Sequence, residues 1–168
     1  QILNAPKPEG QPISVSTPKS SNRNFLAIQT QNGPKTDQIG LVLPTSLCSG
    51  QIAQLITKQL NQKKLGHNRG ISRFVALAHT EGCGASGGSS ERLYAQTLIG
   101  HLVHPIVGLG VLLEHGCEKT HNDYIKNDLA QLGINSTQYG WASVQLDGGI
   151  DAVTQKIEQW FNQSVAEL

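Results

Sequence analysis

The chain has 168 residues, a formal net charge of +1 at pH 7 and 15% charged residues. This length suits one domain with a substantial core, and the scattered basic residues argue against a nucleic-acid partner. No apolar run approaches the ~20 residues of a membrane span, and no signal peptide opens the chain.

The sequence begins at Gln1 and contains no methionine, so we expect a processed chain or a piece of a longer protein. Its three cysteines cannot all pair with one another, and their spacing is not that of a small secreted scaffold. We therefore expect a reducing, cytoplasmic setting.

Residues 1–24 hold four of the seven prolines and show no periodicity that buries a face, which predicts a linker or an edge extension. We expect residues 25–168 to form one α/β domain. Phe25–Ile28 is a short strand candidate, and Asn32-Gly33 favours a tight turn because both residues tolerate positive φ. We expect this hairpin to pack into the core.

Four later segments are predicted strands. They are residues 39–44, 73–78, 107–113 and 139–146. The second is continuously apolar from residue 74 to 78, which is typical of a strand buried on both faces of a parallel sheet. The loop that follows each strand carries polar residues, and the first such loop is expected at Thr45–Gly50.

Helices are predicted between and after the strands. Apolar residues recur at helical spacing at Ile52, Leu55, Ile56 and Leu60, then at Tyr94, Leu98 and Leu102, then at Ile125, Leu129 and Leu132, and finally from Ile150 to Phe161. The second helix must end before Pro105. Thr120 with Asp123 fits a capping box for the third, which Gly133 ends.

This alternation of strands and helices predicts a three-layer, Rossmann-like α/β domain. Its sheet should be mainly parallel, with right-handed crossovers and helices on both faces. In such a sheet, ligands bind at the carboxyl ends of the strands.

The three cysteines occupy equivalent places in this fold: Cys48 follows the first buried strand, Cys83 the second and Cys117 the third. Parallel strands bring these positions to one edge of the sheet. Thiolates suit soft or borderline metals and iron–sulfur clusters, with His79, Glu118 and His121 as nearby donors. Ordinary packing of free cysteines is the alternative.

The loop after the second strand supports a rival interpretation. Gly82, Gly84 and Gly87 match the spacing G-x-G-x-x-G of dinucleotide-binding turns, and Glu114 could meet a ribose. No lysine follows these glycines, which excludes a P-loop. A non-catalytic binding or assembly module of the same fold is a third alternative.

Several motifs, in order and with compatible gaps, resemble the second (central) domain of the altronate dehydratase and D-galactarate dehydratase family. The resemblance runs from about Phe25 to Phe161. The matching pieces are Phe25-Leu-Ala-Ile28 with Asn32-Gly33, Leu43-Pro-Thr-Ser-Leu-Cys48, Ala78-His-Thr-Glu-Gly-Cys-Gly84, Thr97-Leu-Ile-Gly100 with His104-Pro105, and Gly116-Cys-Glu-Lys119.

The resemblance implies a hydro-lyase that removes water from an aldonate or aldarate such as altronate or galactarate. It implies an iron cofactor, as Fe²⁺ or an iron–sulfur cluster, with Cys48, Cys83 and Cys117 as metal ligands. Elimination of water needs a base and a Lewis acid, and the base would be His79, Glu118 or a group on another domain.

The resemblance also implies a C-terminal catalytic domain, in the same or another chain, and leaves homo-oligomerisation open. Three departures accompany it. Thr36-Asp-Gln38 stands where the family usually has Gly-x-Arg-Asn, Glu114-His115 replaces small or apolar residues, and the C-terminal domain is absent from this sequence. Activity of the isolated chain therefore stays in question.

Overall fold

The computed structural model describes residues 24, 26–30, 33–84 and 87–168. Except for the exposed Asn24, the segment predicted to be a linker or edge extension, residues 1–24, lies outside the described residues.

The core is a four-stranded parallel sheet in the order β4-β3-β5-β6. Its strands are β3 (Ile39–Pro44), β4 (Arg73–Ala76), β5 (Val107–Glu114) and β6 (Gly140–Ser143). All six residues of β3 are buried, because this strand is central and apolar. Gly40 lets Phe74 of the neighbouring strand pack closely, since a Cβ there would lie 2.4 Å from the Phe74 ring.

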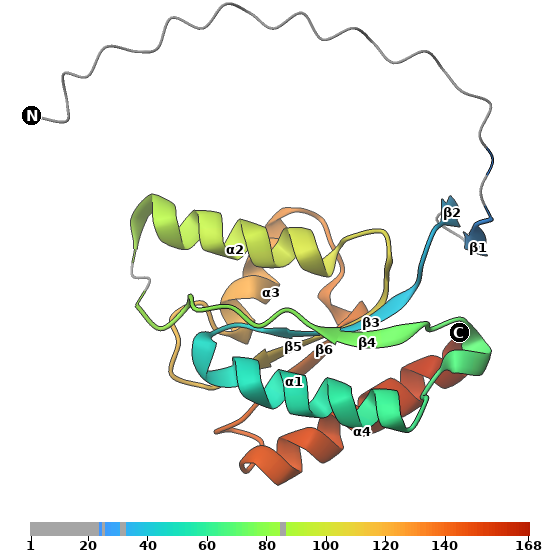
Figure 1. Cartoon of the computed structure of the whole chain (residues 1–168). Helices are drawn as coiled ribbons and strands as arrows, with labels where there is room; N and C mark the ends of the chain where they lie inside the picture. Colours follow the sequence, from blue (N-terminus) through green and yellow to red (C-terminus); the bar gives the residue numbers. More distant parts are fainter. Residues whose placement is uncertain (1–23, 25, 31–32, 85–86) are drawn as a thin grey trace, which may run out of the picture.

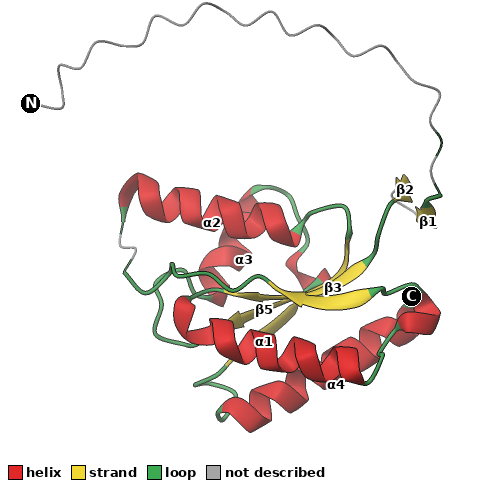
Figure 2. Ribbon diagram, viewed as in Figure 1, coloured by secondary structure: helices red, strands yellow, loops and turns green. Residues whose placement is uncertain are grey.

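Four α-helices cover the two faces of the sheet (Figure 1; Figure 2). They are α1 (Leu47–Gln62), α2 (Gly88–Leu102), α3 (Asn122–Gln131) and α4 (Ile150–Glu167), with short 3₁₀ turns at His67–Arg69 and Ser136–Gln138. Helices α1 and α4 bury one apolar cluster against the sheet, and α2 and α3 bury the other. The predicted three-layer α/β fold with a parallel sheet is confirmed.

The strand order places a topological switch point between β3 and β5. The chain leaves β3 toward β4 on one side and later returns to form β5 on the other side of β3. In open parallel sheets the crevice at such a point, outside the carboxyl ends of the strands, is the usual ligand site.

The N-terminal hairpin differs from expectation. Strands β1 (Ile28–Thr30) and β2 (Gly33–Lys35) pair antiparallel, but they form a separate two-stranded sheet. Leu26 is 99% exposed and Ile28 is also exposed, so the prediction that this hairpin packs into the core is wrong for the described residues. Phe25 and the turn residue Asn32 lie outside the described residues.

Helix boundaries differ at two starts. Helix α1 begins at Leu47, so the predicted Thr45–Gly50 loop is largely helical. Helix α3 is capped by His121, whose ring accepts from the Tyr124 amide, and not by Thr120 as predicted.

Burial also differs at several predicted core positions. Leu55, Leu132 and Ile150 are exposed although their spacing fitted the buried faces. Strand β4 lies at the edge of the sheet and ends at Ala76, and Phe74 is its one buried residue, so the prediction of burial on both faces is wrong there. Within the described part of the chain, we find no helix that is long and apolar enough to span a membrane.

Candidate functional site at the carboxyl ends of the strands

Thr45 joins the loops at the switch point. Its backbone amide donates to Leu113 O at 3.0 Å, and its hydroxyl donates to Glu118 Oε1 at 2.7 Å. Its carbonyl accepts from the Tyr94 hydroxyl at 2.7 Å. Thr45 is fully buried, so these contacts tie the end of β3 to β5, to the loop after β5 and to α2.

The carboxylate of Glu118 organises the loop after β5. It accepts the backbone amides of His115, Gly116 and Cys117 at 2.8, 2.7 and 2.9 Å, in addition to the Thr45 hydroxyl. Burial favours the neutral acid, but the hydrogen bonds outweigh it and lower the pKa of Glu118 to about 2. A carboxylate with four donors and so low a pKa is a weak base at neutral pH.

The ring of His79 links the loop after β4 to the end of β3. Nε2 lies 2.9 Å from the Pro44 carbonyl oxygen, and Nδ1 accepts the Glu81 amide at 3.3 Å. Because a carbonyl only accepts, these partners assign a neutral ring protonated on Nε2. Both ring nitrogens are therefore engaged, which favours a positioning role for His79.

Gly82 allows the loop after β4 to lie against the end of β3. Its φ is +109°, and a Cβ there would lie 2.7 Å from Thr45 O and 2.8 Å from Ser46 Cα. Beside it, the Leu47 amide donates to Glu81 O at 2.9 Å. The backbone thus holds the start of α1 and the loop after β4 side by side.

Two of the predicted metal ligands meet as a result. Cys48 Sγ and Cys83 Sγ lie 3.4 Å apart, and both side chains are exposed. Hydrogen bonding to Cys83 and its nearby charge raise the pKa of the Cys48 thiol, with smaller effects from burial and from the charges of Cys117 and Glu118. The pair therefore forms an accessible two-thiol surface at the carboxyl edge of the sheet.

The third cysteine lies on the loop after β5 at the same end of the sheet. Cys117 is exposed, and its Sγ lies 3.4 Å from His115 Nδ1. No group of three His, Cys, Asp or Glu side chains among the described residues is already arranged to hold a metal ion. Three exposed thiols, one in the first turn of α1 and two on neighbouring loops, nevertheless fit an iron or iron–sulfur group in donor chemistry, provided that a loop shift or an outside ligand completes the set.

The geometry does not favour the dinucleotide alternative. Gly82 contacts the Thr45–Ser46 backbone, and the amide of Gly87, at the N-terminus of α2, already donates to Glu91. Within the described ranges, nothing lies within 4 Å of the Cβ position of Gly84.

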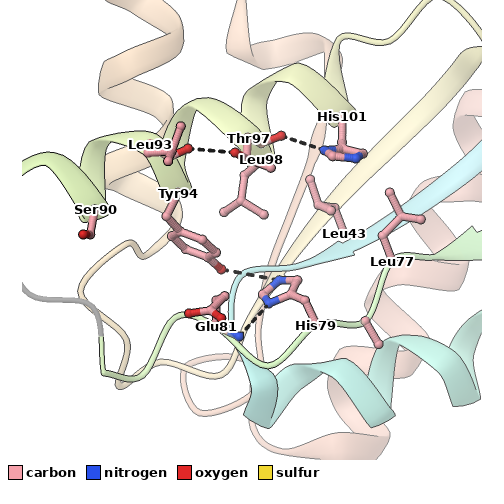
Figure 3. Close-up of a pocket in the computed structure, with 11 residues that line it drawn as sticks. Leu43, Leu77, His79, Glu81, Ser90, Leu93, Tyr94, Thr97, Leu98 and His101 are labelled. Carbon is pink, nitrogen blue, oxygen red and sulfur yellow. Dashed lines mark hydrogen bonds between the residues drawn. The ribbon is translucent and has the colours of Figure 1, made fainter. Parts of the chain in front are cut away.

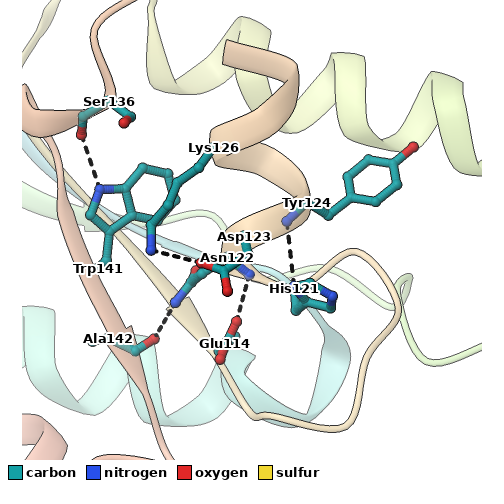
Figure 4. A network of polar contacts seen from close by, with 9 residues as sticks. All are labelled: Glu114, His121, Asn122, Asp123, Tyr124, Lys126, Ser136, Trp141 and Ala142. Atoms are coloured by element: carbon teal, nitrogen blue, oxygen red, sulfur yellow. Dashed lines mark hydrogen bonds and ion pairs between the residues drawn. The ribbon is translucent and has the colours of Figure 1, made fainter. Parts of the chain in front are cut away.

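Glu114, the residue suggested to meet a ribose, is buried and accepts the backbone amide of Asn122 at the start of α3 (Figure 4). The Asn122 side-chain amide in turn donates to the Ala142 carbonyl. Glu114 thus anchors the start of α3 to the end of β5, and Asn122 anchors it to β6.

A cavity of about 460 Å³ lies between α2 and the segment after β4 (Figure 3). Its wall is largely apolar, with Leu43, Leu77, Leu93 and Leu98 on it, and the Tyr94 hydroxyl points toward His79 at its floor. Such a lining suits an apolar group better than a polyhydroxylated one.

Two residues of the site, Thr45 and Tyr94, were given no role from the sequence, and they connect the loops. His115, noted above as part of a departure from the family pattern, contacts Cys117. Thr45 lies within the quoted motif Leu43–Cys48, which was the available signal for it. Tyr94 was interpreted only as part of the apolar face of its helix, and its hydroxyl contact depends on the tertiary fold.

No curated protein and no solved structure matched the chain. One family model did, and its description is D-galactarate dehydratase/altronate hydrolase, second domain. The match covers residues 38–168, which include the whole four-stranded sheet, its helices and all three cysteines. The chain belongs to the D-galactarate dehydratase/altronate hydrolase family and carries its second domain.

Proposed function

We propose that this chain is the iron-holding domain of a sugar-acid dehydratase, a hydro-lyase acting on an aldonate or aldarate. Cys48, Cys83 and Cys117 would be the ligands of the iron or iron–sulfur group. The contact between Cys48 and Cys83 at the carboxyl edge of the sheet carries this proposal, together with Cys117 on the adjoining loop.

The chemistry of the reaction fits these donors. An iron held by thiolates supplies a Lewis acid for the departing hydroxide. The residues of this chain would hold the ligands in place: Glu118 folds the loop that carries Cys117, and His79 with Gly82 positions the loop that carries Cys83.

The base is assigned to another group in this proposal. His79 has both ring nitrogens engaged, and Glu118 has a pKa of about 2 with four donors. Neither is well suited to remove the proton beside the substrate carboxylate at neutral pH. We place the base on a C-terminal catalytic domain, in the same or another chain, which would close over this edge of the sheet.

The test is an assay of the complete protein, purified without oxygen together with any partner chain that copurifies. It is incubated with a panel of aldonates and aldarates, and formation of the α-keto acid produced by loss of water is followed. We expect turnover of at least one sugar acid, lost on iron removal and restored by Fe²⁺. No turnover of any panel member by iron-loaded protein would refute the proposal.

A further inference from the structure

Cys48 and Cys83 lie in the geometry of a thiol pair ready for oxidation. Their sulfurs are 3.4 Å apart although the residues are 35 positions apart in the sequence. A disulfide has an S–S distance of about 2.05 Å, so the sulfurs must approach by roughly 1.4 Å to bond. Both side chains are exposed, so an oxidant in solution can reach them.

Backbone contacts on both sides keep the two thiols together. The Leu47 amide donates to Glu81 O at 2.9 Å, one residue before Cys48 and two before Cys83. Gly82 packs directly on Ser46, with its Cβ position only 2.8 Å from Ser46 Cα. These backbone contacts hold the two cysteine-bearing segments side by side.

The third cysteine has a different neighbour. Cys117 Sγ contacts the ring of His115, and Cys48 and Cys83 contact each other. We propose that Cys48 and Cys83 form a reversible intramolecular disulfide in the metal-free chain, and that Cys117 remains a thiol. This inference concerns the metal-free chain and does not depend on the proposed reaction.

The oxidant can be a low-molecular-weight disulfide such as oxidised glutathione. One cysteine thiolate attacks a sulfur of the oxidant and releases one glutathione thiolate, which takes up the proton that the cysteine lost. The second cysteine attacks the mixed disulfide and releases the other glutathione in the same way. Two cysteines are oxidised, one disulfide is reduced to two thiols, and atoms and electrons balance.

The sequence itself offers a matched control. Cys48 and Cys83 are 35 positions apart, and Cys83 and Cys117 are 34 apart. The entropy of closing these two loops is nearly equal in an unfolded chain, so only the fold distinguishes them. A strong preference for Cys48–Cys83 in the native chain, absent in urea, would therefore be the effect of the structure.

The experiment treats the reduced, chelator-treated chain with oxidised glutathione, counts free thiols and maps disulfides after digestion without reduction. We expect the three thiols to fall to one, with a Cys48–Cys83 linkage in monomeric protein that a reductant reverses. Cys117→Ser should fall from two thiols to none, and Cys48→Ser and Cys83→Ser should form no intramolecular bond. The inference would be overturned if all three thiols persisted, if most of the disulfide involved Cys117, or if disulfide-linked dimers formed. It would also be overturned if the same preference for Cys48–Cys83 appeared in urea. The linkage map of the unsubstituted chain decides the matter even where a variant does not fold.

Discussion

Thr45 and Glu118 are hydrogen bonded at 2.7 Å although 73 residues separate them, and both side chains are buried. This bond joins the end of β3 to the loop after β5, which are the two sides of the switch point. The segment that precedes α1, whose first turn carries Cys48, and the loop that carries Cys117 are therefore both held by the Glu118 carboxylate.

Glu118→Gln should reduce stability at neutral pH and remove part of its dependence on pH. The folded pKa of about 2 lies below the ordinary value of 4.5, so the carboxylate stabilises the fold fully above pH 4.5. That stabilisation is lost as pH falls from 4.5 toward 2, and it amounts to about 3 kcal/mol. Urea unfolding of both proteins should show a difference at pH 7 that shrinks across this window.

The exposed Glu167 provides the control for that measurement. Glu167→Gln should leave both the free energy of unfolding and its pH dependence nearly unchanged. A constant difference between Glu118→Gln and the unsubstituted chain at every pH would contradict the role assigned to the ionised carboxylate.

Gly82→Ala should destabilise the fold by about 2 kcal/mol, because φ is +109° and the new methyl group would meet the Thr45–Ser46 backbone. Gly84→Ala is the matched control, since no described residue lies within 4 Å of its Cβ position. Thermal unfolding of the two variants measures the difference. Equal melting temperatures would show that the close approach at Gly82 has no energetic weight.

Tyr94→Phe should cost about 1 kcal/mol, because the buried carbonyl of Thr45 loses the hydroxyl that donates to it. Tyr139 is a partly buried tyrosine for which we find no hydroxyl hydrogen bond to the described residues, so Tyr139→Phe serves as the comparison. Chemical denaturation of both variants tests this. The account requires the Tyr94 variant to be the less stable of the two.

The sequence was sufficient to predict the strands and their order of alternation with helices. Residues 39–44 are apolar and end at Pro44, and the structure has β3 at the same bounds. The sequence contains no comparable signal for the order of the strands across the sheet. Residues 73–78 therefore resembled a central strand, whereas β4 is an edge strand with only partial burial.

The position of the site in the fold could be predicted from the sequence, but its hydrogen bonds could not. The positions of Cys48, Cys83 and Cys117 after successive strands follow from the alternation of elements. The four donors to Glu118 could not be foreseen, because three are backbone amides brought round by the loop and one is the distant Thr45 hydroxyl. A carboxylate in a strand-end loop therefore resembled a base, although its four donors lower its pKa to about 2 and make it a weak one.

Oxidation should compete with iron. A Cys48–Cys83 disulfide removes two of the three proposed thiolate ligands, so protein oxidised with glutathione should bind iron at least about tenfold more weakly than reduced protein. Reduction should restore binding in the same sample. Equal iron affinity in the two states would contradict ligation of iron by the thiolates of Cys48 and Cys83. It would not contradict the formation of the disulfide, so the two proposals can fail separately.

The central claim is that the three cysteines hold iron, and the most direct measurement is the iron content of the complete protein purified without oxygen. The unsubstituted protein should retain iron, and Cys48→Ser, Cys83→Ser and Cys117→Ser should each lose most of it. Ser90→Ala, an exposed substitution at the start of α2, should not. Iron-free protein under these conditions, or cysteine variants that retain as much iron as the unsubstituted protein, would contradict the account.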